Sequence, residues 1–279
     1  MGGWSIVVPR REIARASGER ILRLPHPALA AHVLSYVAHD LPDTGPVFWQ
    51  VTPLSVLTWV IDLEAPVRRS EDEGVVPDSP ILGLRDRPLV MEQSGATRGI
   101  AVALTPLGAY ALFRNPLREL ANSVIDGWEP LRAGPLLERL AEAPDWPGRF
   151  RLLDEYLMAR LPRGPELAAP VRYAWDRLSA GPVRVDALAE EIGWSRQHLK
   201  VRFREQIGLN PKTVGRIARL NRTMELLNRV SPPSWSEIAY LGGYSDQAHL
   251  IRDFRALTGC TPTDVGKPAG LFVAPGHGT

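Results

Sequence analysis

The chain has little of several features that would place it in a specialised class of protein. Its single cysteine, Cys260, excludes a disulfide within the chain and a zinc cluster built on cysteines. No stretch approaches the run of about eighteen apolar residues that a transmembrane helix needs. The first residues lack the basic and then apolar pattern of a secretory signal. We therefore expect a cytoplasmic protein with no membrane partner.

Net charge is also low, but it is unevenly distributed. The formal charge is +2 over 279 residues, and the hydrophobic fraction of 44% is sufficient for a buried core. Residues 170–265 hold 14 lysines and arginines against 10 aspartates and glutamates, whereas residues 1–169 hold 18 against 21. Length and charge together predict two domains, an acidic one followed by a basic one that suits contact with a nucleic acid.

Two stretches of the basic half share one pattern of apolar residues. Each has a short amphipathic run, a glycine turn, a serine or aspartate that can cap a helix, and a second amphipathic run. The turn is at Gly193 in residues 185–209 and at Gly242-Gly243 in residues 235–262. This spacing predicts two helix-turn-helix units.

One long helix is predicted between the two units. Residues 212–230 place their apolar side chains on one helix face. About twenty residues at about 1.5 Å each span about 30 Å, and successive major-groove faces on one side of B-DNA lie about 34 Å apart. We therefore predict that this helix holds the two units in adjacent segments of the major groove.

The paired units resemble the C-terminal DNA-binding domain of the AraC/XylS family of transcription regulators, most closely in residues 243–262. The resemblance covers about residues 170–265. It implies a bacterial-type regulator whose partners are double-stranded DNA and RNA polymerase, with an N-terminal domain that senses a ligand or mediates dimerisation. The chain departs from the family pattern at Thr223, where alanine is usual, at Leu250, where an aromatic is common, and at Val265-Gly266, where Tyr-Arg is typical.

Outward-facing residues of the second helix of each unit are the candidate DNA contacts. Leu199 and Phe203 set the buried direction of the first such helix, and Leu250 and Phe254 set that of the second. Glutamine suits adenine, lysine or arginine suits guanine, and an apolar side chain suits the thymine methyl group. The candidates are Arg196, Gln197, Lys200, Val201, Arg204, Gln247, Ala248, His249, Ile251, Arg252 and Arg255. For any single one of them the alternative is a solvated helix face.

The front half changes from strand patterns to helix patterns. Short apolar or β-branched runs predict strands at 5–9, 20–24, 47–51, 55–61, 88–91 and 99–104, with a charged loop at 70–80 and an ambiguous segment at 27–37. Apolar residues spaced at three and four predict helices at 116–123, 134–143 and 147–161. The predicted fold class is α+β, with a β-rich, barrel-like N-terminal domain and appended helices, followed by an all-α domain.

The predicted domain boundaries follow from these patterns. The domains are a sensor or dimerisation domain at 1–161 (strands in 1–110, helices in 115–161), a linker at 162–165, the double helix-turn-helix domain at 166–265 and a flexible tail at 266–279. The linker is placed at Pro162-Arg-Gly-Pro165 because this sequence cannot continue a helix.

Tryptophans of the front half are the candidates for lining an apolar pocket, although core packing explains them equally well. They are Trp4, Trp49, Trp59, Trp128 and Trp146. Trp49 and Trp59, on adjacent predicted strands, are the preferred ligand-binding residues, for an apolar or aromatic effector. His26, His32 and His39 match no compact metal-ligand spacing, so we predict no metal, no cofactor and no catalytic residue.

We expect a regulator and not an enzyme. The alternative is a metal-dependent β-barrel enzyme that carries a DNA-targeting domain. Some alkylation-repair proteins join such a domain to nucleophilic cysteines, but this chain has no cysteine before Cys260. Ligand sensing and formation of a homodimer through the helices at 116–123 and 134–143 are both compatible with the sequence.

Overall fold

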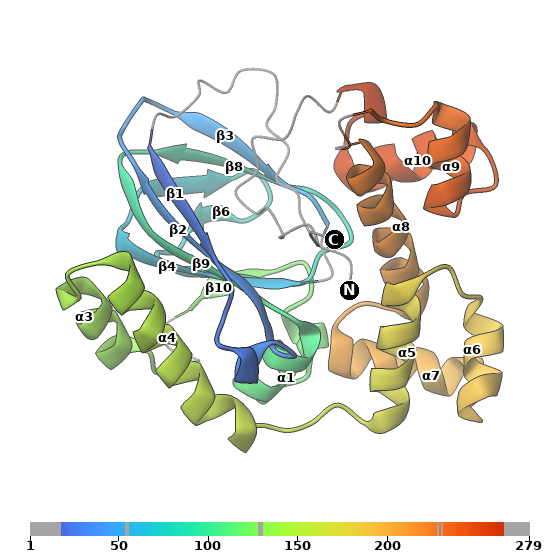
Figure 1. Cartoon of the computed structure of the whole chain (residues 1–279), viewed down its shortest axis with the longest axis horizontal. Helices are drawn as coiled ribbons and strands as arrows, with labels where there is room; N and C mark the ends of the chain where they lie inside the picture. Colours follow the sequence, from blue (N-terminus) through green and yellow to red (C-terminus); the bar gives the residue numbers. More distant parts are fainter. Residues whose placement is uncertain (1–17, 54–55, 128–130, 228, 230, 265–279) are drawn as a thin grey trace.

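The chain has a β-rich N-terminal half and a helical C-terminal half, as Figure 1 shows. The computed structural model describes residues 18–53, 56–127, 131–227, 229 and 231–264. Outside these residues lie the predicted strand at 5–9, Trp4, Trp128, the Val265-Gly266 departure and the predicted tail at 266–279. The predicted α+β fold class is confirmed.

Two antiparallel sheets form the layers of the N-terminal half. The strands are β1 (Glu19–Arg23), β2 (Val33–Leu41), β3 (Val47–Val51), β4 (Leu57–Glu64), β5 (Val67–Ser70), β6 (Gly74–Val76), β7 (Pro80–Leu82), β8 (Leu89–Ser94), β9 (Thr97–Leu104) and β10 (Val124–Asp126). One sheet has the order β1-β2-β9-β4-β7-β10 and the other β3-β8-β5-β6. The central strand β9 is buried along most of its length because its sheet is covered on both faces.

The helices begin after β9. They are α1 (Pro106–Phe113), α3 (Gly134–Glu142), α4 (Trp146–Arg160), α5 (Ala169–Ala180), α6 (Val185–Ile192), α7 (Arg196–Ile207), α8 (Pro211–Leu227), α9 (Trp235–Gly242) and α10 (Gln247–Thr258). Short 3-10 turns are η1 (Pro27–Leu29), η2 (Leu117–Glu119), η3 (Leu161–Arg163) and η4 (Pro262–Asp264). Among the described residues, no helix is long and apolar enough to cross a membrane.

Helix α4 covers the outer face of the six-stranded sheet. The ring of Tyr36 stacks on Phe150 with 5.9 Å between centroids, and its hydroxyl donates to Asp154 Oδ1 at 2.8 Å. Burial and the neighbouring carboxylate raise the pKa of Tyr36 well above its usual range, so the phenol stays protonated. On the same face, the buried ring of Trp59 packs against Tyr156. This apolar layer fixes α4 to the sheet.

Two predictions for the front half are wrong. Residues 116–123 form only the turn η2 before β10 begins, because Asn122 adopts a positive φ of 59° and its side-chain oxygen accepts from the Asp86 amide. The predicted loop at 70–80 contains β6, which forms a local hairpin with β5. The ambiguous segment at 27–37 divides into the short 3-10 turn η1 and the first residues of β2.

Helix α1 is absent from the sequence-based prediction, although its local signal is clear. Thr105 caps the helix by accepting from the Gly108 amide at 3.0 Å, and Pro106 occupies the first turn. The predicted change from strands to helices near residue 110 therefore falls inside a helix. The helices predicted at 134–143 and 147–161 are confirmed as α3 and α4.

The C-terminal half docks on the N-terminal half through the end of α7. Ile207 and Leu209 are buried, and their core is continuous with Leu117 of η2. Gly208 has a φ of +95°, and a Cβ there would lie 2.9 Å from the backbone oxygen of Leu117. Only glycine suits both the backbone conformation and this close approach. The first helix-turn-helix unit is therefore held directly against the N-terminal half.

Candidate DNA-binding interface

Both predicted helix-turn-helix units are present, and both turn at a left-handed glycine. Helix α6 ends at Gly193 with a φ of 74°, and α9 ends at Gly243 with a φ of 81°. The next helix is capped in each case. Ser195 Oγ accepts from the His198 amide at 3.2 Å, and Asp246 Oδ1 accepts from the His249 amide at 2.7 Å. These caps fix where α7 and α10 begin.

An aromatic residue braces each turn against a histidine of the following helix. The rings of Trp194 and His198 meet edge to face at 4.5 Å between centroids, and those of Tyr244 and His249 do so at 5.3 Å. The second turn is one residue longer, and the added Ser245 shares a hydrogen bond of 3.1 Å with Nδ1 of His249. The two units are therefore built on one local plan.

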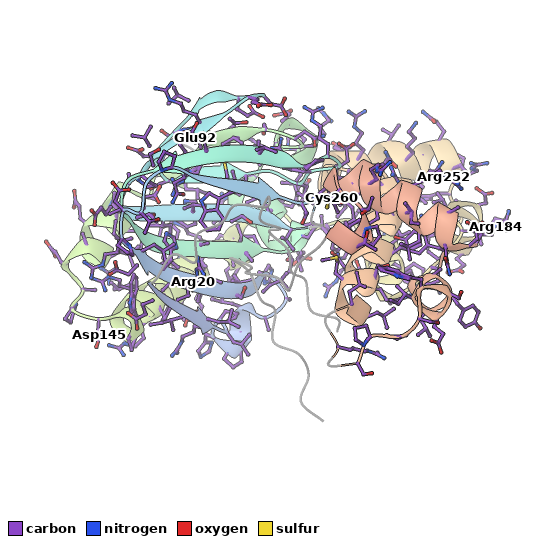
Figure 2. The ribbon with its side chains drawn as sticks, turned by 90° about the horizontal axis from the view of Figure 1, so that it is seen from above. Arg20, Glu92, Asp145, Arg184, Arg252 and Cys260 are labelled. Atoms are coloured by element: carbon purple, nitrogen blue, oxygen red, sulfur yellow. The ribbon has the colours of Figure 1, made fainter. Side chains whose placement is uncertain are left out.

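The candidate DNA contacts lie on the solvent-accessible faces of α7 and α10. All of those on α7 are exposed, and so are all of those on α10 except His249, which is half-buried. Figure 2 places Arg252 in the part of the helical half that is farther from the sheets. The apolar candidates Val201 and Ile251 are 53% and 42% exposed, which is unusual for residues that could have packed in a core.

Three candidates already have partners within the chain. Arg196 Nε lies 2.8 Å from Asp186 Oδ1, Gln247 Nε2 donates to Ser236 Oγ at 2.7 Å, and His249 contacts Ser245. These side chains would exchange a protein partner for a phosphate or a base on binding. Within the described part of the chain, the other candidates form no ion pair or side-chain hydrogen bond of this kind.

The two faces present different chemistry at matching positions. When the helices are aligned on their caps, Lys200 and Val201 of α7 correspond to Ile251 and Arg252 of α10. On α7 the cation Lys200 comes before the apolar Val201, whereas on α10 the apolar Ile251 comes before the cation Arg252. Because guanine and thymine are read by different groups, the two faces are suited to different base sequences.

Helix α8 connects the units. It is described from Pro211 to Leu227, and these 17 residues at about 1.5 Å each span about 25 Å. The predicted end at Val230 lies outside the described residues. In Figure 1 it runs from the pair α6–α7 to the pair α9–α10.

An ionic network fixes α10 to α8. Arg216 Nε donates to Asp253 Oδ1 at 2.6 Å, and an Arg219 nitrogen lies 3.5 Å from Asp253 Oδ2. The Arg219 guanidinium also lies over the ring of Tyr244, 5.5 Å from its centroid. Burial and the nearby Asp253 raise the pKa of Tyr244 to about 12, so its ring remains neutral beside these charges.

The departures at Thr223 and Leu250 fit the structure. Thr223 is fully buried and its hydroxyl donates to the backbone oxygen of Arg219 at 3.0 Å. A Cβ on Gly242 would lie only 3.0 Å from that hydroxyl, so the larger side chain at 223 is matched by glycine at 242. Leu250 is buried in the small core of the second unit.

A cavity of about 50 Å³ lies between the two sheets of the N-terminal half. Trp49 reaches it from β3, and its buried indole nitrogen has no hydrogen-bond partner among the described residues. Arg68 also lines the cavity and is held by Asp62, with nitrogen to oxygen distances of 2.7 and 2.8 Å. This cavity combines an apolar wall with an unused donor.

His39 is a neutral group in the same cavity. Burial lowers the pKa of His39 to about 4, and its Nε2 lies 3.3 Å from Thr97 Oγ1. Trp59 does not share the cavity with Trp49, since its ring packs on the opposite face of the sheet against Tyr156. Within the described residues, no group of three or more His, Cys, Asp or Glu side chains could hold a metal ion.

Two family models match separate parts of the chain. Residues 188–267 match the model of a helix-turn-helix domain, and residues 22–126 match a domain of unknown function, DUF6597. The F1 operon positive regulatory protein of Yersinia pestis is 29% identical over 92 residues, which cover 33% of this chain and 30% of that protein. The HTH-type transcriptional regulator GlxA of Rhizobium meliloti is 36% identical over 89 residues, covering 32% and 27%.

A solved structure of ToxT from Vibrio cholerae aligns with 82% of this chain and 96% of its own, with 10% identity and a TM-score of 0.47. The chain spans less than a third of the length of the two curated relatives, and those matches are confined to about a third of this chain. The resemblance predicted for the basic half is confirmed, and the C-terminal part of the chain is a helix-turn-helix domain of the AraC type.

Proposed function

We propose that the chain is a sequence-specific DNA-binding transcription regulator and not an enzyme, acting in the cytoplasm. The observation that carries this proposal is the pair of exposed helices, α7 and α10, at the two ends of α8. Each enters one of two adjacent major-groove segments. DNA is the partner that an AraC-type helix-turn-helix domain binds, and RNA polymerase is the partner through which such a regulator acts.

The exposed faces divide into base-reading and phosphate-binding groups. Lys200 and Arg252 donate to guanine, Gln197 pairs with adenine, and Val201 and Ile251 contact thymine methyl groups. The flanking arginines Arg196, Arg204 and Arg255 bind phosphates and set the position of the protein on the duplex.

A selection from a random duplex library tests this function. Purified full-length protein should enrich a site with two short boxes about one helical turn, roughly 10 base pairs, apart. Failure to enrich any sequence, with or without a pool of metabolites, would contradict sequence-specific reading.

Arg252→Ala tests base reading by the second unit. Loss of a bidentate contact to guanine should weaken binding to the selected site by about 1–3 kcal/mol and relax specificity at one position. Arg196→Ala is the matched control, since losing a phosphate contact weakens binding to selected and random DNA alike. Titrations on both DNAs measure these effects, and equal losses for Arg252→Ala would exclude its role as a base reader.

We further propose that the N-terminal half controls DNA binding through a small molecule or through dimerisation. The indole N–H of Trp49 in the cavity between the sheets supports the first option, because it suits an acceptor on an otherwise apolar or aromatic effector. At about 50 Å³ this cavity is smaller than the roughly 300–1,000 Å³ usual for small-molecule sites, so such an effector must displace lining side chains to enter. An effector should quench Trp49 fluorescence, and Trp49→Phe should lose that response.

Analytical ultracentrifugation tests dimerisation. Metal analysis of the purified protein tests the enzyme alternative, which requires a bound metal.

A further inference from the structure

A second pocket, of about 390 Å³, lies on the helical side of the N-terminal half. Its lining is three arginines and three apolar residues: Leu112, Phe113, Arg114, Leu131, Arg132 and Arg160. None of these residues lines the cavity between the sheets. We propose that this arginine pocket binds a small organic anion, namely a carboxylate or phosphate ester that carries an apolar body.

Among the described residues, no carboxylate forms an ion pair with the arginines of the pocket, Arg114, Arg132 and Arg160. Arg114 donates to the backbone oxygen of Arg163 at 2.9 Å, and the Arg160 guanidinium lies over the ring of Tyr156 at 4.3 Å. Three arginines lining one pocket give it a positive potential that favours an anion. Carboxylates and phosphates match guanidinium geometry through paired hydrogen bonds.

Backbone strain points to the same two side chains. Arg114 and Arg132 have φ values of 60° and 47°, in the left-handed region that favours glycine. Arg114 caps the end of α1, a position where glycine is common, and its amide donates to the Tyr110 oxygen at 3.1 Å. Strained backbone of this kind persists where ligands are clamped. The chain keeps a cationic side chain where glycine would be less strained.

The apolar residues define the rest of the ligand. Leu112, Phe113 and Leu131 are buried, with 8%, 8% and 2% of their surfaces exposed. The pocket volume lies within the range of about 300–1,000 Å³ that is usual for small-molecule sites. A ligand with its charged group at the arginines and its apolar body against these side chains satisfies both parts of the lining.

The location links the pocket to the first DNA reader, a consequence that rests on the proposed function. Helix α1, which contributes Leu112 and Phe113, packs on α7 and on η3. Arg160 is the last residue of α4 and directly precedes η3, from which the chain continues into α5. A ligand in the arginine pocket therefore acts on α1, which packs on α7, and on η3, which leads into α5.

Calorimetry with full-length protein tests the site, with octanoate, inorganic phosphate and octanamide as probes. Octanoate should bind and uncharged octanamide should not. Arg132→Gly should weaken octanoate binding by about tenfold or more while keeping or raising the thermal midpoint of the free protein, because glycine relieves the strain at 132. Arg151→Gln is the matched control, since Arg151 is exposed on α4 and does not line the pocket.

The outcomes separate the parts of the proposal. Equal binding of octanoate and octanamide, or unchanged octanoate binding by Arg132→Gly, would overturn anion recognition. Binding of phosphate without octanoate would overturn the apolar body. If octanoate binds but leaves the affinity of wild-type protein for its selected DNA unchanged, the link to the first reader is wrong. Octanoate binding by a protein that selects no DNA would assign the failure to the proposed function and not to the pocket.

Discussion

The two helix-turn-helix units share their local construction but are held in place differently. Each has a left-handed glycine, a capped second helix and an aromatic–histidine contact at the turn. The first unit is fixed by apolar docking of α7 on η2 and α1 of the N-terminal half. The second has an apolar core with Leu226 of α8 and, in addition, the carboxylate of Asp253 between Arg216 and Arg219.

This difference teaches that one local construction can be held by different surroundings. Under the proposed function, the contact with the N-terminal half would make the first unit the one that responds to changes in that half, whereas the second unit would follow the connecting helix. Four experiments test this division.

Removing the ionic contact should have the largest effect. Asp253→Ala leaves the guanidinium groups of Arg216 and Arg219 partly buried without their carboxylate, and breaking such a pair costs about 3–5 kcal/mol. Urea denaturation measures the loss, and hydrogen exchange should locate it in α9 and α10.

The control for this substitution is in the first unit. Asp186→Asn removes an exposed carboxylate that pairs with Arg184 and Arg196, so a cost below about 1 kcal/mol is expected. Similar losses for the two substitutions would show that the Asp253 network does not hold the second unit.

Acidification should lower the stability of the N-terminal half, against which α7 of the first unit packs. Burial lowers the folded-state pKa of His39 to about 4, below its usual 6.5, with Asp62 and Arg68 as charged neighbours. Below pH 6.5 the unfolded chain takes up a proton that the folded chain refuses. Stability is therefore lost as pH falls from 6.5 to 4, by about 2–3 kcal/mol.

Comparison with His39→Gln isolates this contribution from that of other titrating groups. Urea denaturation across the pH range should give a shallower decline for the variant, and hydrogen exchange should rise in α7 before α10. Parallel declines for the two proteins would contradict the role of His39.

A pair of glycine substitutions tests the docking contact itself. Gly208→Ala and Gly193→Ala both place a side chain at a positive φ, but a Cβ at 193 meets nothing within 4 Å, whereas at 208 it meets the Leu117 oxygen at 2.9 Å. We expect Gly208→Ala to cost about 1–2 kcal/mol more than Gly193→Ala, because it adds a steric clash and because ψ of −36° at Gly208, against 24° at Gly193, is less favourable for alanine. Thermal denaturation compares them. Equal losses would mean that α7 is not tightly docked.

The smallest effects should be equal in the two units. Ser195→Ala and Asp246→Ala each remove one helix cap, at about 1 kcal/mol. Since capping belongs to the shared local plan, neither value should depend on the N-terminal half. Circular dichroism during urea denaturation provides the measurement, and a cost several times larger at one cap would show that the units differ locally.

Sequence predicted the features that depend on neighbours along the chain. The caps at Ser195 and Asp246 and the turns at Gly193 and Gly243 were evident from spacing, as were the exposed faces of α7 and α10. These features are determined within a few residues, so no knowledge of the rest of the fold is required.

Features that depend on distant partners could not be predicted. The helix expected at 116–123 yields to the contact of Asn122 with Asp86 and to the pairing of β10 with β7. Trp49 and Trp59 are both buried, but nothing in their sequence context shows that they face different layers. The positive φ of Arg132 likewise has no sequence signal, because arginine has no preference for that conformation.

Helix α8 also sets the angular relation between the readers. Inserting one residue in a helix rotates everything after it by about 100° and moves it by about 1.5 Å. Rotation therefore matters far more than the added length, since a reader turned by that angle no longer faces the same side of the duplex. Lengthening of α8 is compatible with paired reading only in steps that nearly restore the phase, about seven residues for two turns. If the two units read DNA as proposed, the separation of their two boxes would change in discrete increments and not continuously.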